Sequence, residues 1–170
     1  MLSKSEIVAG EFYHRYIQNI EEGDINKNLK KNTRQFKKFL KEIPRKKVDR
    51  AYAEGKWTIR EILQHLIDAE RVFSYRALRF ARKDGTPLPG FDENTWALTA
   101  GAAGRRSWDD LQEEFRAVRK STEALFASMN DDQLQFVGEA SGTAQNALAL
   151  AYLIPGHVVH HIRVIKERYL

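Results

Sequence analysis

Cysteine is absent from this chain of 170 residues. Its absence excludes disulfide bridges, zinc sites built on thiolates and a catalytic thiol supplied by the protein itself, and it fits a reducing compartment. The N-terminal residues lack the apolar core of a signal peptide. The longest strongly apolar run, ALALAYLI (residues 147–154), is far shorter than a membrane span. We therefore expect a soluble, cytoplasmic protein.

Strand patterns, internal repeats and low-complexity segments are also missing from the sequence. What is present is 42% hydrophobic and 11% aromatic residues, which is enough to fill one core. The length suits a single domain over residues 1–170.

Positive charge is concentrated in one segment. Residues 26–50 hold eleven Lys or Arg side chains and two acidic ones, whereas the remainder of the chain is acidic. Such a segment can bind nucleic acid. However, Leu29, Phe36 and Leu40 recur within it at helical spacing, so we favour the solvated face of a helix.

Helical periodicity dominates the chain. A capping box of Thr58 and Glu61 marks one helix start, and Ser107 offers a cap to another. The expected helical segments are residues 3–43 with a break or kink at the Glu-Gly-Asp of 22–24, then 58–84, 107–129 and 144–169. These four units predict an all-α four-helix bundle. The long connection after residue 84, with a short helix near ENTWAL, permits an up-down-down-up arrangement with a crossover between the second and third helices.

Three of the five histidines lie in GHVVHHIRVIKERYL, residues 156–170. His157 and His161 are about 40° apart on a helix and share its apolar stripe, while His160 lies to one side. Two buried imidazoles need either hydrogen-bond partners or a shared metal ion. The HxxxH spacing alone does not choose between these alternatives.

A second helix contributes His65, at the margin of the apolar stripe of residues 59–80, where a half-solvated side chain is the commoner case. Glu70 lies within that stripe, so its carboxylate needs a buried partner. Arg168 or Arg76 could supply an ion pair, or Glu70 could hold a metal-ligating histidine. His14 has no companions and is interpreted as structural or exposed.

The blocks YAEGKWTIREILQHLIDAERVFSYRALRFARKD, LPGFDENTW and GHVVHHIRVIKERYL together resemble the DinB-like superfamily of damage-inducible proteins. The resemblance extends from about Ser5 to Leu170. It implies an up-down-down-up bundle in which His65, His157 and His161 hold a divalent metal ion.

Two residues depart from the family pattern. Val158 stands where the family often has an acid, which leaves the three ligands intact and excludes an HExxH protease. Pro155 lies inside the last helix and predicts either a kink one turn before the site or a helix that restarts there.

Three neutral imidazoles leave a coordination position open, which is typical of catalytic rather than structural sites. All-imidazole ligation suits several transition metals, of which we favour nickel or zinc. The family resemblance implies a hydrolase or a transferase that uses a low-molecular-weight thiol. The alternative is a non-enzymatic, metal-stabilised bundle that acts as a binding protein.

Partners are predicted less specifically. We expect an unidentified small-molecule substrate and a homodimer, and we disfavour a membrane or nucleic acid. The residues expected to line the cleft beside the metal are aromatic: Trp57, Tyr75, Phe91 and Trp96.

Overall fold

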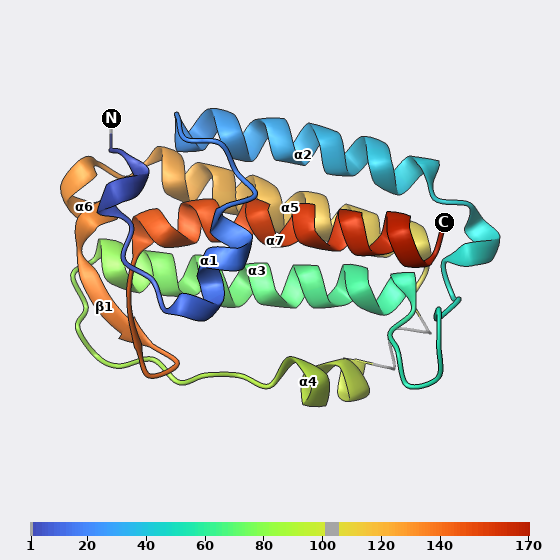
Figure 1. Cartoon of the computed structure of the whole chain (residues 1–170). Helices are drawn as coiled ribbons and strands as arrows, with labels where there is room; N and C mark the ends of the chain where they lie inside the picture. Colours follow the sequence, from blue (N-terminus) through green and yellow to red (C-terminus); the bar gives the residue numbers. More distant parts are fainter. Residues whose placement is uncertain (1, 101–105) are drawn as a thin grey trace.

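The computed structural model describes residues 2–100 and 106–170. Its elements along the chain are η1 (Lys4–Glu6), α1 (Glu11–Ile17), α2 (Ile25–Glu42), η2 (Arg45–Lys47), α3 (Ile59–Ala81), α4 (Glu93–Thr99), α5 (Trp108–Ala127), α6 (Asp131–Gln135), β1 (Val137–Ala140), β2 (Thr143–Asn146) and α7 (Ala147–Arg168). The four long helices α2, α3, α5 and α7 form the bundle (Figure 1).

The direction of the long helices confirms the predicted topology. Helices α2 and α7 run one way along the bundle and α3 and α5 run the other way (Figure 1). The connection from α3 to α5 returns along the bundle and carries the short helix α4 at the predicted ENTWAL segment. The fold is therefore an up-down-down-up four-helix bundle.

Local capping explains where two of the bundle helices begin. The Thr58 hydroxyl accepts a hydrogen bond from the Glu61 amide at 3.2 Å, and the Glu61 carboxylate accepts one from the Thr58 amide at 2.6 Å. Ser107 and Asp110 form the same reciprocal pair at the start of α5. Each box satisfies amides that the first helical turn leaves without partners.

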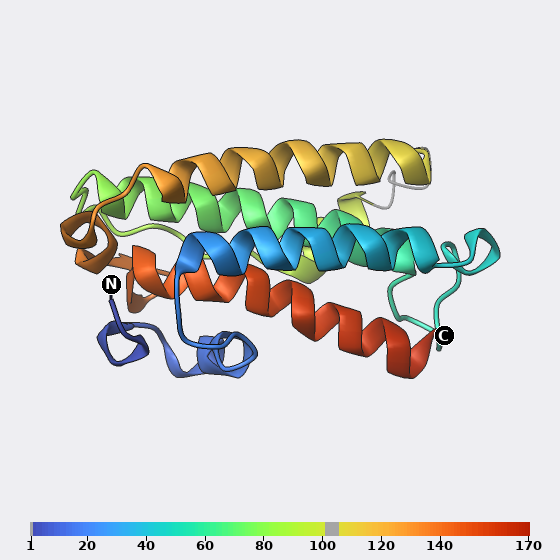
Figure 2. The same ribbon diagram turned by 90° about the horizontal axis from the view of Figure 1, so that it is seen from above.

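In the first segment the structure has a break, one of the two predicted alternatives. The break at residues 22–24 is complete, and the residues before it form the short elements η1 and α1. Figure 2 shows these elements outside the bundle, beside α7. The Asp24 carboxylate caps α2 by accepting hydrogen bonds from the amides of Asn26 and Lys27.

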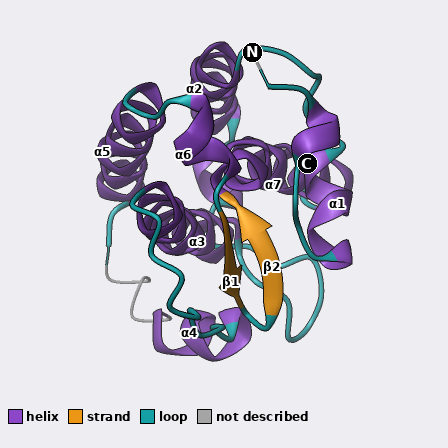
Figure 3. Ribbon diagram, turned by 90° about the vertical axis from the view of Figure 1, so that its left-hand side faces the viewer, coloured by secondary structure: helices purple, strands orange, loops and turns teal. Residues whose placement is uncertain are grey.

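A β-hairpin replaces the irregular passage expected before the last helix, so the expectation of no strands is wrong here. β1 and β2 pair antiparallel from Val137–Asn146 to Ala140–Thr143. Ser141 and Gly142 join them with φ of 54° and 71°, which is the left-handed geometry of a tight hairpin turn. Figure 3 shows the hairpin at one end of the bundle, where it contacts α3 and α7.

Pro155 does not restart the last helix, because α7 is continuous from Ala147 to Arg168. The helix changes direction along its length in Figure 2. Next to the proline, α1 approaches so closely that a Cβ atom on Gly156 would lie 2.1 Å from the Tyr16 carbonyl oxygen. A glycine is therefore required at this crossing.

Helix α7 is also the central core helix of the bundle. By length and composition it could cross a membrane, but 67% of its most apolar window is buried by the other elements. That burial is what a core helix requires. In α2 the apolar residues Leu29, Phe36 and Leu40 are buried, while Lys30, Lys37 and most other basic residues are exposed, as predicted for a solvated helix face.

Candidate metal centre

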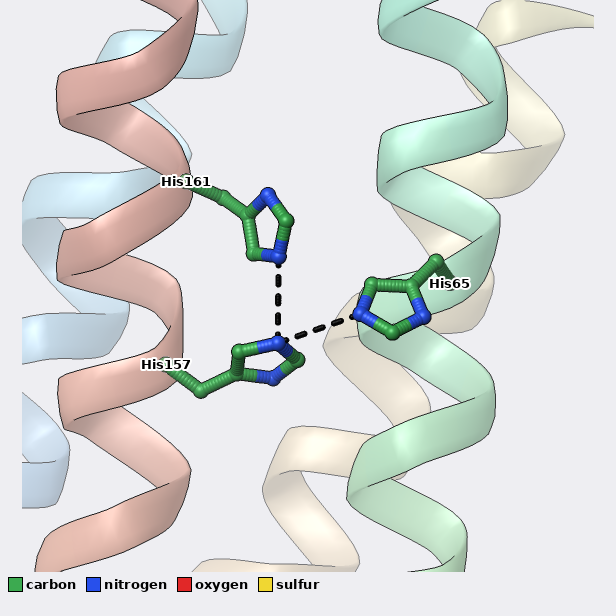
Figure 4. A group of neighbouring side chains, drawn as sticks. All are labelled: His65, His157 and His161. Carbon is green, nitrogen blue, oxygen red and sulfur yellow. Dashed lines mark hydrogen bonds between the residues drawn. The ribbon is translucent and has the colours of Figure 1, made fainter. Parts of the chain in front are cut away.

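Three imidazole rings from two helices converge inside the bundle. His65 comes from α3, and His157 and His161 come from α7 (Figure 4). The Nε2 atom of His157 lies 3.1 Å from Nε2 of His65 and 3.0 Å from Nε2 of His161. One ring nitrogen from each residue lies within 4.8 Å of the others. The structure thus brings together the three predicted ligand residues, which we call the histidine trio.

Burial keeps the trio uncharged. His157 and His161 expose 7% and 9% of their surface, and His65 is partly buried. Burial lowers the pKa of His65 to about 4. Burial and the neighbouring histidines hold the pKa of His157 and of His161 well below the ordinary value. All three rings are therefore neutral at pH 7, with lone pairs available for a ligand.

The spacing of the Nε2 atoms fits a divalent ion. Around a tetrahedral zinc ion with bonds of about 2.0–2.1 Å, two nitrogen ligands are about 3.3 Å apart. The two closest separations, 3.1 and 3.0 Å, are near this value. In addition, Nδ1 of His161 is buried without a hydrogen-bond partner, so this ring is held by packing and by whatever its Nε2 atom binds.

The trio opens onto a cleft of about 270 Å³. Its walls are mostly aromatic, and Glu93, Ser141 and His160 add polar side chains to its lining. The aromatic residues that line it are Phe12, Tyr13, Tyr16, Trp57, Phe73 and Phe91. A site with an apolar wall and few polar groups is typical for a small organic ligand.

The predicted cleft residues are half right. Trp57 and Phe91 line the cleft. The ring of Trp96 packs on Phe91 at 4.9 Å between centroids but lines a smaller hollow behind His65. Tyr75 is 50% exposed and lies on another face of α3, beside Arg79.

The predicted partners of Glu70 are wrong. Its carboxylate forms a bidentate ion pair with Arg119 of α5, at 2.7 and 2.8 Å. Arg168 is exposed, and Arg76 donates instead to the Pro89 carbonyl and to the Ser141 hydroxyl. Glu70 is therefore a structural ion-pair residue and does not support a ligand histidine.

Other cleft residues were missed by the sequence reasoning. Tyr16 packs its ring edge against His157 at 5.1 Å between centroids, and burial raises the pKa of its phenol. Ser141 reaches the cleft only because of the hairpin, for which the Ser-Gly dipeptide was the available signal. His160 lines the cleft but stands outside the trio, as its helical angle indicates, and His14 is exposed.

Comparison with known proteins identifies the family. The model of the DinB superfamily matches residues 28–165, a range that includes the whole histidine trio. The chain belongs to the DinB superfamily.

Two relatives of this DinB superfamily protein are informative. A protein of Oceanobacillus iheyensis named "putative metal-dependent hydrolase" is 24% identical over 143 residues, which cover 82% of this chain and 80% of the relative. The structure of YfiT from Bacillus subtilis superposes with a TM-score of 0.71 at 20% identity, over 94% of this chain and 87% of that one. YfiT is described as "a probable metal-dependent hydrolase with an unusual four-helix bundle topology".

Proposed function

We propose that this protein is a metal-dependent hydrolase whose divalent ion is held by His65, His157 and His161. The observation that carries the proposal is the convergence of three neutral imidazoles at one end of an aromatic cleft. The names of both relatives support the same reaction class. Three nitrogen ligands leave at least one coordination position for a water molecule or a substrate oxygen.

The chemistry follows from that open position. When bound, a divalent ion polarises a carbonyl oxygen and acidifies a water molecule. The trio would hold the ion, and the aromatic walls would exclude bulk water and so strengthen electrostatic interactions in the cleft. Glu93 is the one acidic side chain among the described residues that line the cleft, and we assign it the role of general base.

Tyr16 completes the set of polar groups beside the trio. Its phenol oxygen accepts a hydrogen bond from Arg15 at 2.8 Å, so its own proton can be donated to a substrate or leaving group. Because burial raises the pKa of Tyr16, the phenol stays protonated at neutral pH. We infer that Tyr16 is a hydrogen-bond donor in the reaction.

The finer assignments extend the proposal. We favour zinc or nickel as the ion because all three ligands are imidazoles, and we place the protein in the cytoplasm because the chain lacks cysteine. A low-molecular-weight thiol is the co-substrate to be tested beside water, since a thiolate can occupy the open position. Large exposed apolar side chains such as Phe12, Tyr52 and Trp96 support a homodimer.

Metal analysis of untagged protein tests the proposal. We expect close to one equivalent of zinc or nickel, and hydrolysis of at least one member of an ester, amide and thiol-conjugate panel. His65→Ala is expected to lose both, whereas His14→Ala, at an exposed histidine outside the trio, keeps both. Less than about 0.2 equivalents of metal, with no uptake on titration, contradicts the proposal.

A structural role for the trio is the second candidate. Nε2 of His157 can accept one hydrogen bond, from either His65 or His161. In this alternative a bound metal ion would only stabilise the bundle of a binding protein. If His65→Ala lowers the melting temperature and wild-type protein with bound metal shows no activity in the panel, the structural role is correct.

A further inference from the structure

Arg76 is a buried cation whose charge no neighbouring acid neutralises. The side chain comes from α3 and is 1% exposed. Unlike Arg119, which pairs with Glu70, it has no carboxylate partner anywhere in residues 2–100 and 106–170. Its Nη2 donates to the Pro89 carbonyl at 3.0 Å and to the Ser141 hydroxyl at 2.8 Å, and its Nη1 has no hydrogen-bond partner. The guanidinium also lies 5.9 Å from the centroid of the Phe91 ring, a contact that does not neutralise its charge. Buried charges are normally paired, so this exception requires an explanation.

Ser141 connects this cation to the cleft. It lies at the tip of the hairpin and lines the same cleft as the histidine trio. Its amide donates to the Leu88 carbonyl at 3.0 Å, which fixes the turn against the crossover segment. Because its hydroxyl oxygen accepts from Arg76, the hydroxyl proton remains available to donate.

The backbone at Ser141 is unfavourable for serine. Its φ of 54° is left-handed, a conformation that glycine adopts without the cost a side chain incurs. Compared with glycine, a serine at this position makes the turn less stable but places a hydroxyl group at the cleft. Strained positions of this kind are common at functional sites.

The electrostatics of this end of the cleft favour an anionic acceptor. The Arg76 guanidinium is 1% exposed and donates to the Ser141 hydroxyl at 2.8 Å, so a buried positive charge lies directly behind the hydroxyl of this exposed residue. Two further charges lie at the cleft: the Arg15 guanidinium, 4.7 Å from the centroid of the Tyr16 ring, and the Glu93 carboxylate. They have opposite signs, so the preference for an anion rests on Arg76. One hydroxyl donor matches a carboxylate better than a phosphate, whose three oxygens normally engage several donors.

We propose that Ser141, positioned by Arg76, binds a carboxylate group of the substrate. The aromatic walls would take an apolar body of about the size of a phenyl ring. Ser141 is then a specificity-determining residue, and Arg76 is a positioning residue that acts through it. This inference rests on the proposed function, because it names the class of substrate that the same cleft binds.

Binding of two matched probes to zinc-loaded protein tests the inference. Phenylacetate carries the carboxylate, and phenylacetamide has the same shape without the charge. Isothermal titration calorimetry gives both dissociation constants for the wild type and for Ser141→Gly. This variant removes the hydroxyl and relieves the left-handed backbone, so it is expected to fold. Thr143→Ala is the matched control, because it removes a hydroxyl from the same hairpin outside the cleft.

The expected result is a selective loss. Ser141→Gly should weaken phenylacetate binding by about tenfold and phenylacetamide binding by less than about twofold. Thr143→Ala should change neither. Arg76→Lys should lose the same discrimination between the probes while it keeps its affinity for phenylacetamide, which a general loss of structure would not preserve.

Two outcomes would overturn the inference. One is an unchanged affinity of Ser141→Gly for phenylacetate, which would place the carboxylate on the metal alone. The other is tighter binding of phenyl phosphate with the same dependence on Ser141. The zinc content of each sample is measured separately and reports on the metal centre. If the protein takes up no zinc but still distinguishes phenylacetate from phenylacetamide through Ser141, only the hydrolase proposal is contradicted.

Discussion

At the scale of single residues, the Glu70–Arg119 ion pair is the buried charge pair that ties three helices together. Glu70 and Arg119 are 3% and 0% exposed, and Arg119 also donates to the Asn32 side chain of α2 at 2.8 Å. Arg119→Met would leave the Glu70 carboxylate buried without its partner. We expect it to lower the free energy of unfolding by about 3–5 kcal/mol, measured by urea denaturation.

Two further variants separate burial from charge. Glu70→Leu combined with Arg119→Met should recover part of the loss, because no charge then remains unpaired. Asp109→Asn breaks an exposed pair with Arg45 and should change stability by less than about 1 kcal/mol. If Arg119→Met and Asp109→Asn lowered the free energy of unfolding equally, burial would not determine how much stability is lost when an ion pair is broken.

At the scale of elements, the crossing of α1 over α7 positions one wall of the cleft. Gly156→Ala would place a methyl group 2.1 Å from the Tyr16 carbonyl oxygen, so α1 must move outward and carry Tyr16 away from His157. Overpacking of this kind costs about 1–3 kcal/mol, which urea denaturation would detect. Gly85→Ala is the control, since a Cβ there meets nothing within 4 Å. An unchanged stability of Gly156→Ala would mean that α1 is not held at this crossing.

The same elements show which parts of the fold can be predicted from the sequence. Helix starts were predictable at Thr58 and Ser107, because a capping box is read from residues three apart. The inward direction of His157 and His161 followed from helical angles. The hairpin was not predictable from alternation, because its strands have only four residues each and VGEA contains few apolar side chains. Its Ser-Gly turn was the one local signal.

The partner of Glu70 shows where that reasoning stops. Periodicity indicates that a side chain points inward, but it does not say which residue of another helix stands opposite. Arg119 lies 49 positions along the chain from Glu70, on a helix whose neighbours depend on the bundle topology. The choice among Trp57, Tyr75, Phe91 and Trp96 as cleft residues was limited in the same way.

At the scale of the whole molecule, the neutral histidine trio makes the metal-free protein sensitive to acid. The folded-state pKa of His65 is about 4, and those of His157 and His161 are also lowered, whereas unfolded histidines have a pKa near 6.5. Above pH 6.5 the rings are neutral in both states, so they contribute no pH dependence. Below it the unfolded chain takes up protons and the folded protein does not, so stability falls as pH falls from about 6.5 toward 4.

Urea denaturation between pH 7.5 and 5.0, with a chelator present, would measure this dependence. Each histidine that stays neutral in the folded protein should cost about 2 kcal/mol of unfolding free energy at pH 5. His161→Leu should flatten the dependence by about 2 kcal/mol at pH 5, because one of the histidines with a lowered pKa is removed. His14→Ala, at an exposed position, should leave it unchanged.

Zinc at neutral pH should raise the stability of the wild type and not of His161→Leu. That result would mean that the ring nitrogens that stay unprotonated in the metal-free protein are also those that bind the ion. A metal-free protein equally stable at pH 7.5 and pH 5 would instead mean that the folded trio takes up protons below pH 6.5 as readily as the unfolded chain, so that burial does not lower its pKa values.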